Sequence, residues 1–166
     1  MIESFTGRWR FLSNFHPCTI EFQGIKYPSV EHYYVAMKIK TDQQIEGRNI
    51  TLIDCREMIS RMKDTAKVKQ LGKILKLRKD WELIKLDTML FGVREKFKDE
   101  ELRQMLLDTG DQELIEGNNW GDKFWGVSAG EGQNNLGKIL MKVRKEIRDE
   151  NIKPSLEDFL FSKGKS

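Results

Sequence analysis

The stretch that most constrains the fold runs from residue 19 to residue 38, where a hairpin pattern leads directly into a helix. Residues 19–22 and 25–27 have the composition of two short strands, and Gln23 and Gly24 between them suit a tight turn. Pro28 ends the second strand, and Ser29 is a residue type that caps helix N-termini. The sequence therefore predicts a β-hairpin followed at once by a helix.

Glu31 and Lys38 should lie on one face of that helix. They are seven residues apart, and seven steps of about 100° return to nearly the same direction with a rise of about 10.5 Å. The pair could serve as a general acid or electrostatic carboxylate with an amine that contacts phosphate, ribose or a carbonyl carbon. Alternatively, Glu31 only complements the helix dipole and Lys38 is an ordinary surface lysine. Considered alone, the spacing favours this second interpretation.

The rest of the chain is predicted to be largely helical, with Thr51, Asp64 and Asp80 as helix caps. The expected elements are helices over residues 80–98, 100–107, 134–148 and 154–161 and a strand over residues 113–116. No repeat or linker divides the chain. We therefore expect an α+β fold, mostly helical, as a single domain with a small N-terminal β-hairpin and short strands. Residues 1–150 form the expected domain and residues 151–166 a C-terminal extension.

Composition excludes several classes of protein. The chain has 166 residues, of which 39% are hydrophobic and 33% charged, which suits one folded domain rather than a disordered chain. No apolar run is long enough to span a membrane, and no secretory signal is recognised. The two cysteines are too far apart for a CxxC motif, and there are only two histidines. We expect a cytoplasmic protein with free thiols and no metal.

Positive charge is concentrated between Arg61 and Lys79, where eight basic residues accompany one acid. Such a segment is either a solvated helix face or a contact surface for a polyanion or a phosphate-bearing substrate. Lys69, Lys73 and Lys76 would share one helix face. No aromatic residue lies among them, so stacking on single-stranded bases is not predicted there.

Residues 116–126 combine two carboxylates, two tryptophans and three glycines. A tryptophan in such a loop either fills the core or stacks on a flat ligand, and Asp122 could orient a water molecule or a ribose hydroxyl. The glycine-rich residues 130–137 then lead into the last helix, where free N–H groups could bind an anion. Asn134 can equally be the N-cap of that helix.

The order of these motifs resembles the YbiA-like NADAR family over residues 5–148. The resemblance rests on FLSNF at residues 11–15, YPSVEHYY at 27–34 followed by Lys38, LRKDW at 77–81, LLDTGD at 106–111 and DKFWG at 122–126. After Gly126 the sequence departs from the family pattern, with residues 127–129 in place of a shorter, more polar stretch, which leaves loop shape and substrate choice open.

The resemblance implies a metal-independent hydrolase acting on N-glycosyl bonds, without a cofactor. Its substrate would be a ribosylamino-pyrimidine phosphate of riboflavin biosynthesis or ADP-ribosylated guanine in nucleic acid. A non-catalytic module that binds ADP-ribose or a nucleotide remains the alternative, and the oligomeric state is left open. The residues carried over as catalytic are Glu31, Lys38 and Asp122. The residues carried over as substrate contacts are Asn14, Phe15, Glu116, Trp125, Gly126 and Asn134.

In this interpretation Glu31 is the principal acid/base. Lys38 either contacts phosphate or ribose or attacks the C1 aldehyde of an opened ribose. Asp122 would orient water or ribose, and Trp125 would pack on the base or the sugar.

Overall fold

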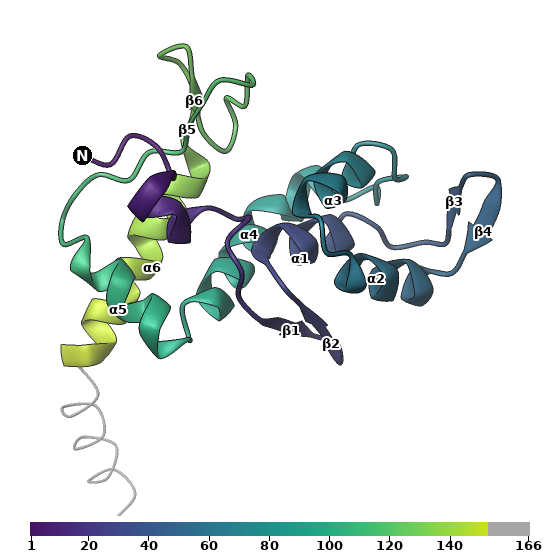
Figure 1. Ribbon diagram of the computed structural model, residues 1–166, viewed down its shortest axis with the longest axis horizontal. Coiled ribbons are helices and arrows are strands. Elements are labelled where there is room, and N and C mark those ends of the chain that lie inside the picture. The colour runs from purple at the N-terminus through teal and green to yellow at the C-terminus, as the bar shows by residue number, and fades with distance from the viewer. Residues whose placement is uncertain (153–166) are drawn as a thin grey trace, which may run out of the picture.

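The computed structural model describes residues 1–152, with side chains described up to residue 150 (Figure 1). The helices are a 3₁₀ helix, Gly7–Leu12, and α1 Val30–Met37, α2 Leu52–Arg61, α3 Thr65–Gly72, α4 Trp81–Lys96, α5 Glu100–Asp108 and α6 Asn135–Ile152. The strands are β1 Ile20–Phe22, β2 Ile25–Tyr27, β3 Gln43–Ile45, β4 Arg48–Ile50, β5 Gly117–Asn118 and β6 Val127–Ser128. These elements confirm the mostly helical α+β fold.

Helix α4 joins two groups of helices. At one end of the molecule α1, α2 and α3 lie together, and at the other end α5 packs against α6 (Figure 1). Helix α4 contacts α1 in the first group and α6 in the second. This arrangement brings the N-terminal half of the chain next to the C-terminal half.

Helix α1 is the centre of the first group. Every residue from Val30 to Met37 is buried, because α2, α3 and α4 all contact this helix. Its start is set as predicted: the Ser29 hydroxyl accepts a hydrogen bond from the backbone N–H of His32 at 3.1 Å. A polar residue on α1 is therefore inside the protein whichever face it occupies.

Two hairpins have the same kind of turn. Gln23 and Gly24 between β1 and β2 have φ of 49° and 80°, and Glu46 and Gly47 between β3 and β4 have φ of 51° and 75°. Positive φ at both positions is typical of the type I′ turn that suits the twist of a two-residue hairpin. The first hairpin was predicted; the second lies where only helix was expected. Buried Gln43 stabilises it through side-chain hydrogen bonds to the backbone of Lys76.

The predicted strand over residues 113–116 is wrong. Leu114 forms only an isolated parallel bridge with Ile2, and β5 begins later, at Gly117. Only one residue of the N-terminal segment pairs with this stretch. The backbone N–H of Ile2 donates to the Glu113 carbonyl oxygen, the Ile2 carbonyl oxygen accepts from the Ile115 N–H, and the pairing stops there. The chain then turns toward β6, with which β5 pairs in parallel.

The helix caps agree with the sequence in part. The side chains of Thr51 and Asp64 accept hydrogen bonds from the first turns of α2 and α3. Asp80 precedes α4 but makes no side-chain cap, because its carboxylate binds Arg78 at 2.6 Å instead. Lys76 does not share a helix face with Lys69, because α3 ends at Gly72. The helix predicted over residues 154–161 lies outside the described residues.

Within residues 1–152, no helix is long and apolar enough to cross a membrane.

Gly137→Ala tests how tightly α6 approaches the segment that precedes β5. Alanine usually stabilises a helix by about 1 kcal/mol relative to glycine. Here a β-carbon would overlap the carbonyl oxygen of Leu114 and the amide of Asn134. We expect a loss of about 1–3 kcal/mol in the free energy of unfolding, measured with urea. Lys142→Ala, at an exposed position of the same helix, is the control. A Gly137→Ala protein as stable as that control would contradict the close approach.

Candidate active site

Glu31 places a carboxyl group inside the protein. It lies in the first turn of α1, is 9% exposed, and its backbone N–H donates to the carbonyl oxygen of Asn14 at 3.1 Å. Burial raises the pKa of the Glu31 carboxyl; the positive charges of Lys38 and Lys69 oppose this rise and the charge of Asp122 adds to it. Glu31 is therefore biased toward its protonated form, as a proton donor requires.

Lys38 lies at the C-terminal end of α1 and is half-buried. Its ammonium is 5.1 Å from the centre of the Tyr34 ring. Burial lowers the pKa of the Lys38 amine, Glu31 opposes this, and the like charges of Lys69, Lys73 and Lys85 lower it further. Glu31 lies in the first turn of α1, as a dipole carboxylate does, but it is buried, and Lys38 is half-buried rather than exposed. The two groups interact, and both are partly withdrawn from water.

The end of α1 is held from two sides. Arg56 donates to the carbonyl oxygens of Ala36 and Ile39 at 3.1 and 2.9 Å, and the backbone N–H of Arg78 donates to the carbonyl oxygen of Lys38 at 2.8 Å. The backbone that carries Lys38 is therefore restrained, while its amine is left to face the site.

Glu116 brings a second buried carboxyl to Glu31's surroundings. Its Oε2 atom is buried and has no hydrogen-bond partner among the described residues. Burial, followed by the charge of Asp122, raises the pKa of Glu116 to about 7, against the opposing charge of Lys69. Glu116 can therefore gain or lose a proton near neutral pH.

Asp122 shapes the loop that carries the tryptophans. Its Oδ1 accepts from the backbone N–H groups of Phe124 and Trp125 at 3.1 and 2.9 Å. Trp125 then closes the loop onto α1, since its indole N–H donates to the Tyr34 hydroxyl at 3.1 Å. The two rings are nearly perpendicular, with centroids 5.5 Å apart. Asp122 thus positions Trp125 and also contributes charge to the site.

Gly126 and Asn134 hold the backbone of Glu116. A β-carbon at Gly126 would overlap the Glu116 carbonyl oxygen. The Asn134 side chain accepts from the Glu116 N–H at 2.9 Å and donates to the Leu114 carbonyl at 2.9 Å. Both polar atoms of the Asn134 amide are engaged within the protein. In this structure it fixes the position of Glu116.

Asn14 and Phe15 approach the site from the N-terminal side. The Asn14 amide contacts the sulfur of Met89 at 3.6 Å, and the Phe15 ring lies 5.8 Å from the ammonium of Lys69. Buried Lys96 holds their loop by donating to the Ser13 carbonyl oxygen at 2.8 Å.

Two neighbours of these groups, Tyr34 and Lys69, were not singled out from the sequence as site residues. Tyr34 connects α1 to Trp125, and Lys69 lies between the rings of Phe15 and Trp120. Lys69 belongs to the basic segment between Arg61 and Lys79, and the charge of that segment was the sequence feature that could have indicated it. Tyr34 is part of the YPSVEHYY motif, but nothing in the sequence pattern distinguished it from an aromatic residue of the hydrophobic core.

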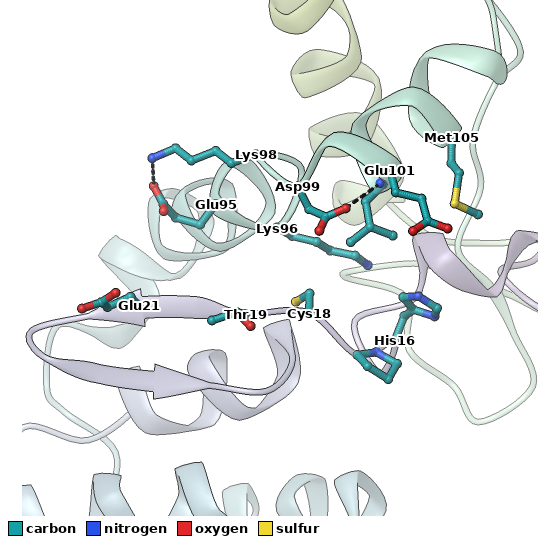
Figure 2. A pocket seen from close by; sticks show the side chains of 12 residues that line it. His16, Cys18, Thr19, Glu21, Glu95, Lys96, Lys98, Asp99, Glu101 and Met105 are labelled. Carbon is teal, nitrogen blue, oxygen red and sulfur yellow. Dashed lines mark hydrogen bonds and ion pairs between the residues drawn. The ribbon is translucent and has the colours of Figure 1, made fainter.

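A separate pocket of about 640 Å³ lies between β1, the end of α4 and the start of α5 (Figure 2). Figure 2 shows Lys96 extending toward His16 in this pocket. None of the nine site residues predicted from the sequence lines it. The pocket is therefore distinct from the cluster around Glu31.

Within the described residues, no three His, Cys, Asp or Glu side chains are arranged to hold a metal ion.

Comparison with known proteins adds a family to this geometry. The model of the NADAR domain matches residues 4–148, which include every residue of the cluster. The chain belongs to the NADAR family. The solved NMR structure of YbiA from Escherichia coli has the same fold, with a TM-score of 0.72, 30% sequence identity, and coverage of 92% of this chain and 89% of that one.

Two relatives of this NADAR domain carry functional names. A riboflavin biosynthesis protein of Vibrio vulnificus is 39% identical over 143 residues, which are 84% of this chain. An N-glycosidase of Nostoc punctiforme is 37% identical over 139 residues, covering 82% of this chain and 85% of the relative. The chain spans 36% of the length of the Vibrio protein, so that protein contains further sequence.

Glu116→Gln tests the buried carboxyl through the pH dependence of stability. A pKa of about 7 in the folded state exceeds the ordinary value, so the folded protein binds this proton more tightly than the unfolded chain. The resulting stability is fully present below the unfolded pKa and is lost as pH rises through about 7. The stability of the variant relative to wild type should therefore increase by roughly 1–3 kcal/mol between about pH 4 and pH 8.

Urea unfolding at several pH values measures this difference. Glu113→Gln, in an exposed side chain of the same segment, is the matched control. If the stability of Glu116→Gln relative to wild type does not change with pH, the Glu116 carboxyl is not buried in the way described.

Proposed function

We propose that this protein is an N-glycosidase that hydrolyses the C–N bond between C1 of a ribose and a nitrogen base. The observation that carries the proposal is the buried Glu31 carboxyl, whose ionisation responds to Lys38, Lys69 and Asp122. The names of the Nostoc and Vibrio relatives support it. We take a ribosylamino-pyrimidine phosphate as the preferred substrate, because the Vibrio relative is named for riboflavin biosynthesis.

The chemistry requires a proton for the leaving nitrogen and negative charge near C1. Cleavage of a glycosidic bond passes through a state with positive charge shared between C1 and the ring oxygen. Glu31, whose pKa is raised by burial, would donate the proton to the departing nitrogen. Ionised Asp122 or Glu116 would stabilise the positive charge. Water would then add to C1 and lose a proton to one of these carboxylates.

Lys38 offers a second route through an opened ribose. Its lowered pKa increases the share of free amine at neutral pH. Opening of the ring breaks the bond between C1 and the ring oxygen, which takes a proton, and leaves C1 doubly bonded to the base nitrogen. The amine would add to C1 as this double bond becomes a single bond and the amine loses a proton. The C1–N bond to the base would then break as the base takes a proton. A C1=N bond to Lys38 would remain. Water would hydrolyse this imine, releasing the sugar aldehyde and restoring the amine.

A second candidate substrate is ADP-ribosylated guanine in nucleic acid. Trp120 is 59% exposed and lies beside Lys69, so an aromatic face and positive charge are available next to the cluster. Such surfaces favour stacked bases and phosphates. The remaining alternative is a binding module without activity, which would retain ligand but release no product.

Glu31→Gln should abolish most of the activity. Glutamine keeps the shape of the side chain but cannot donate the proton, so we expect kcat to fall about 100-fold or more. The assay incubates purified protein with a ribosylamino-pyrimidine phosphate and, separately, with an ADP-ribosylated guanine oligonucleotide. Released base and sugar are followed by mass spectrometry.

Glu46→Gln, in the exposed turn between β3 and β4, is the control and should keep wild-type activity. A folded Glu31→Gln protein that cleaves either substrate at the wild-type rate would rule out the role given to Glu31. Wild-type protein that binds both substrates but releases no product would support the binding module.

Reduction with borohydride tests the role of Lys38. If Lys38 forms an imine with C1, borohydride added during turnover should trap the sugar on Lys38 and inactivate the enzyme. Peptide mass mapping locates the adduct, and Lys38→Ala should give none. If no adduct forms and Lys38→Ala raises KM with kcat unchanged, Lys38 instead contacts the phosphate or the ribose.

A further inference from the structure

Lys69 occupies a place that its sequence position alone does not reveal. It lies on α3, and its ammonium is 5.8 Å from the centre of the Phe15 ring and 4.7 Å from that of Trp120. Phe15 comes from the N-terminal loop and Trp120 from the loop between β5 and β6. Lys69 therefore connects two loops that belong to distant parts of the chain.

The ammonium of Lys69 affects three titratable groups of the cluster. It lowers the pKa values of Glu31 and Glu116 and also that of Lys38. Among the described residues it takes part in none of the ion pairs. The ammonium lies near two aromatic rings and forms no ion pair with a carboxylate of the described residues, so it has N–H groups to offer to an incoming anion.

The cluster has an excess of positive charge in which an anion would be stabilised. Lys69, Lys73 and Lys85 lie close enough to Lys38 to affect its amine, and of these three Lys85 is paired with Glu82. The opposing carboxyl of Glu31 is biased toward its neutral form. A phosphate would offset repulsion among these ammonium groups, since Lys69 takes part in no ion pair within the described part of the chain.

We propose that Lys69 is the specificity-determining residue that binds the phosphate carried by the ribose of the substrate. The aromatic rings of Phe15 and Trp120 hold the ammonium in place when no substrate is bound. The proposal rests on the proposed function, since it assigns a subsite of the same cluster. The phosphate can be a 5′-monoester or part of the diphosphate of ADP-ribose, because both present the same oxygens to an ammonium group.

Binding of ribose 5-phosphate, ADP-ribose and unphosphorylated ribose, measured by NMR titration without turnover, tests this assignment. Lys69→Met keeps an apolar side chain between the two rings but removes the charge. It should weaken binding of the phosphorylated ligand roughly tenfold to hundredfold and leave ribose unaffected. Lys69→Arg should restore most of the affinity. Lys67→Met, at an exposed position of the same helix, is the control and should bind as wild type does.

The two phosphorylated probes distinguish the source of the phosphate. A loss confined to ribose 5-phosphate assigns Lys69 to a monoester, and a loss confined to ADP-ribose assigns it to the diphosphate. Wild-type protein that binds neither probe, or a Lys69→Met protein that binds both as wild type does, overturns the proposal. An equal loss for unphosphorylated ribose also overturns it, because the role would then be structural.

This measurement can fail separately from the proposed function. If binding depends on the Lys69 charge but the cleavage assay gives no product, the phosphate subsite is supported and the glycosidase activity is contradicted. If the wild-type protein cleaves its substrate and Lys69→Met binds the phosphorylated ligands as wild type does, the glycosidase activity is supported and the phosphate subsite is contradicted.

Discussion

The burial of helix α1 on all sides is the constraint on which the candidate site depends. Because α2, α3 and α4 pack around α1, Glu31 is far less exposed to water than a carboxylate near a helix N-terminus normally is. Its charged form loses hydration, and the neutral form is favoured. The same enclosure withdraws Lys38 from water and lowers the pKa of its amine. One packing arrangement therefore raises the pKa of the Glu31 carboxyl and lowers the pKa of the Lys38 amine.

The loop of residues 116–126 completes the cluster through contacts that are far apart in sequence. Asp122 sets its turn, Trp125 attaches it to Tyr34 91 residues away, and Asn134 fixes the backbone of Glu116. Of these hydrogen bonds, the one between Trp125 and Tyr34 connects the loop to α1 in the first helical group. A site assembled from both groups can combine carboxyls of different pKa, which is the arrangement that acid–base catalysis requires.

Membership of the NADAR family and the geometry of the cluster support the same chemistry by separate routes. The family model covers residues 4–148 and the fold matches that of YbiA. The position of Lys69 comes from the structure of this chain, where its ammonium lies beside Phe15 and Trp120. The pocket that Lys96 lines contains none of the predicted site residues.

Local features could be predicted because they depend on residues close in sequence. The β1–β2 turn follows from Gly24, the start of α1 from Ser29, and α4, α5 and α6 from helical periodicity. Burial, by contrast, depends on which distant segments meet. Spacing placed Glu31 and Lys38 on one face, but only the packing of α2, α3 and α4 buried the Glu31 carboxyl. The same reason explains the missed Lys69 and the wrong strand at 113–116, where Ile2 supplied a single pairing residue.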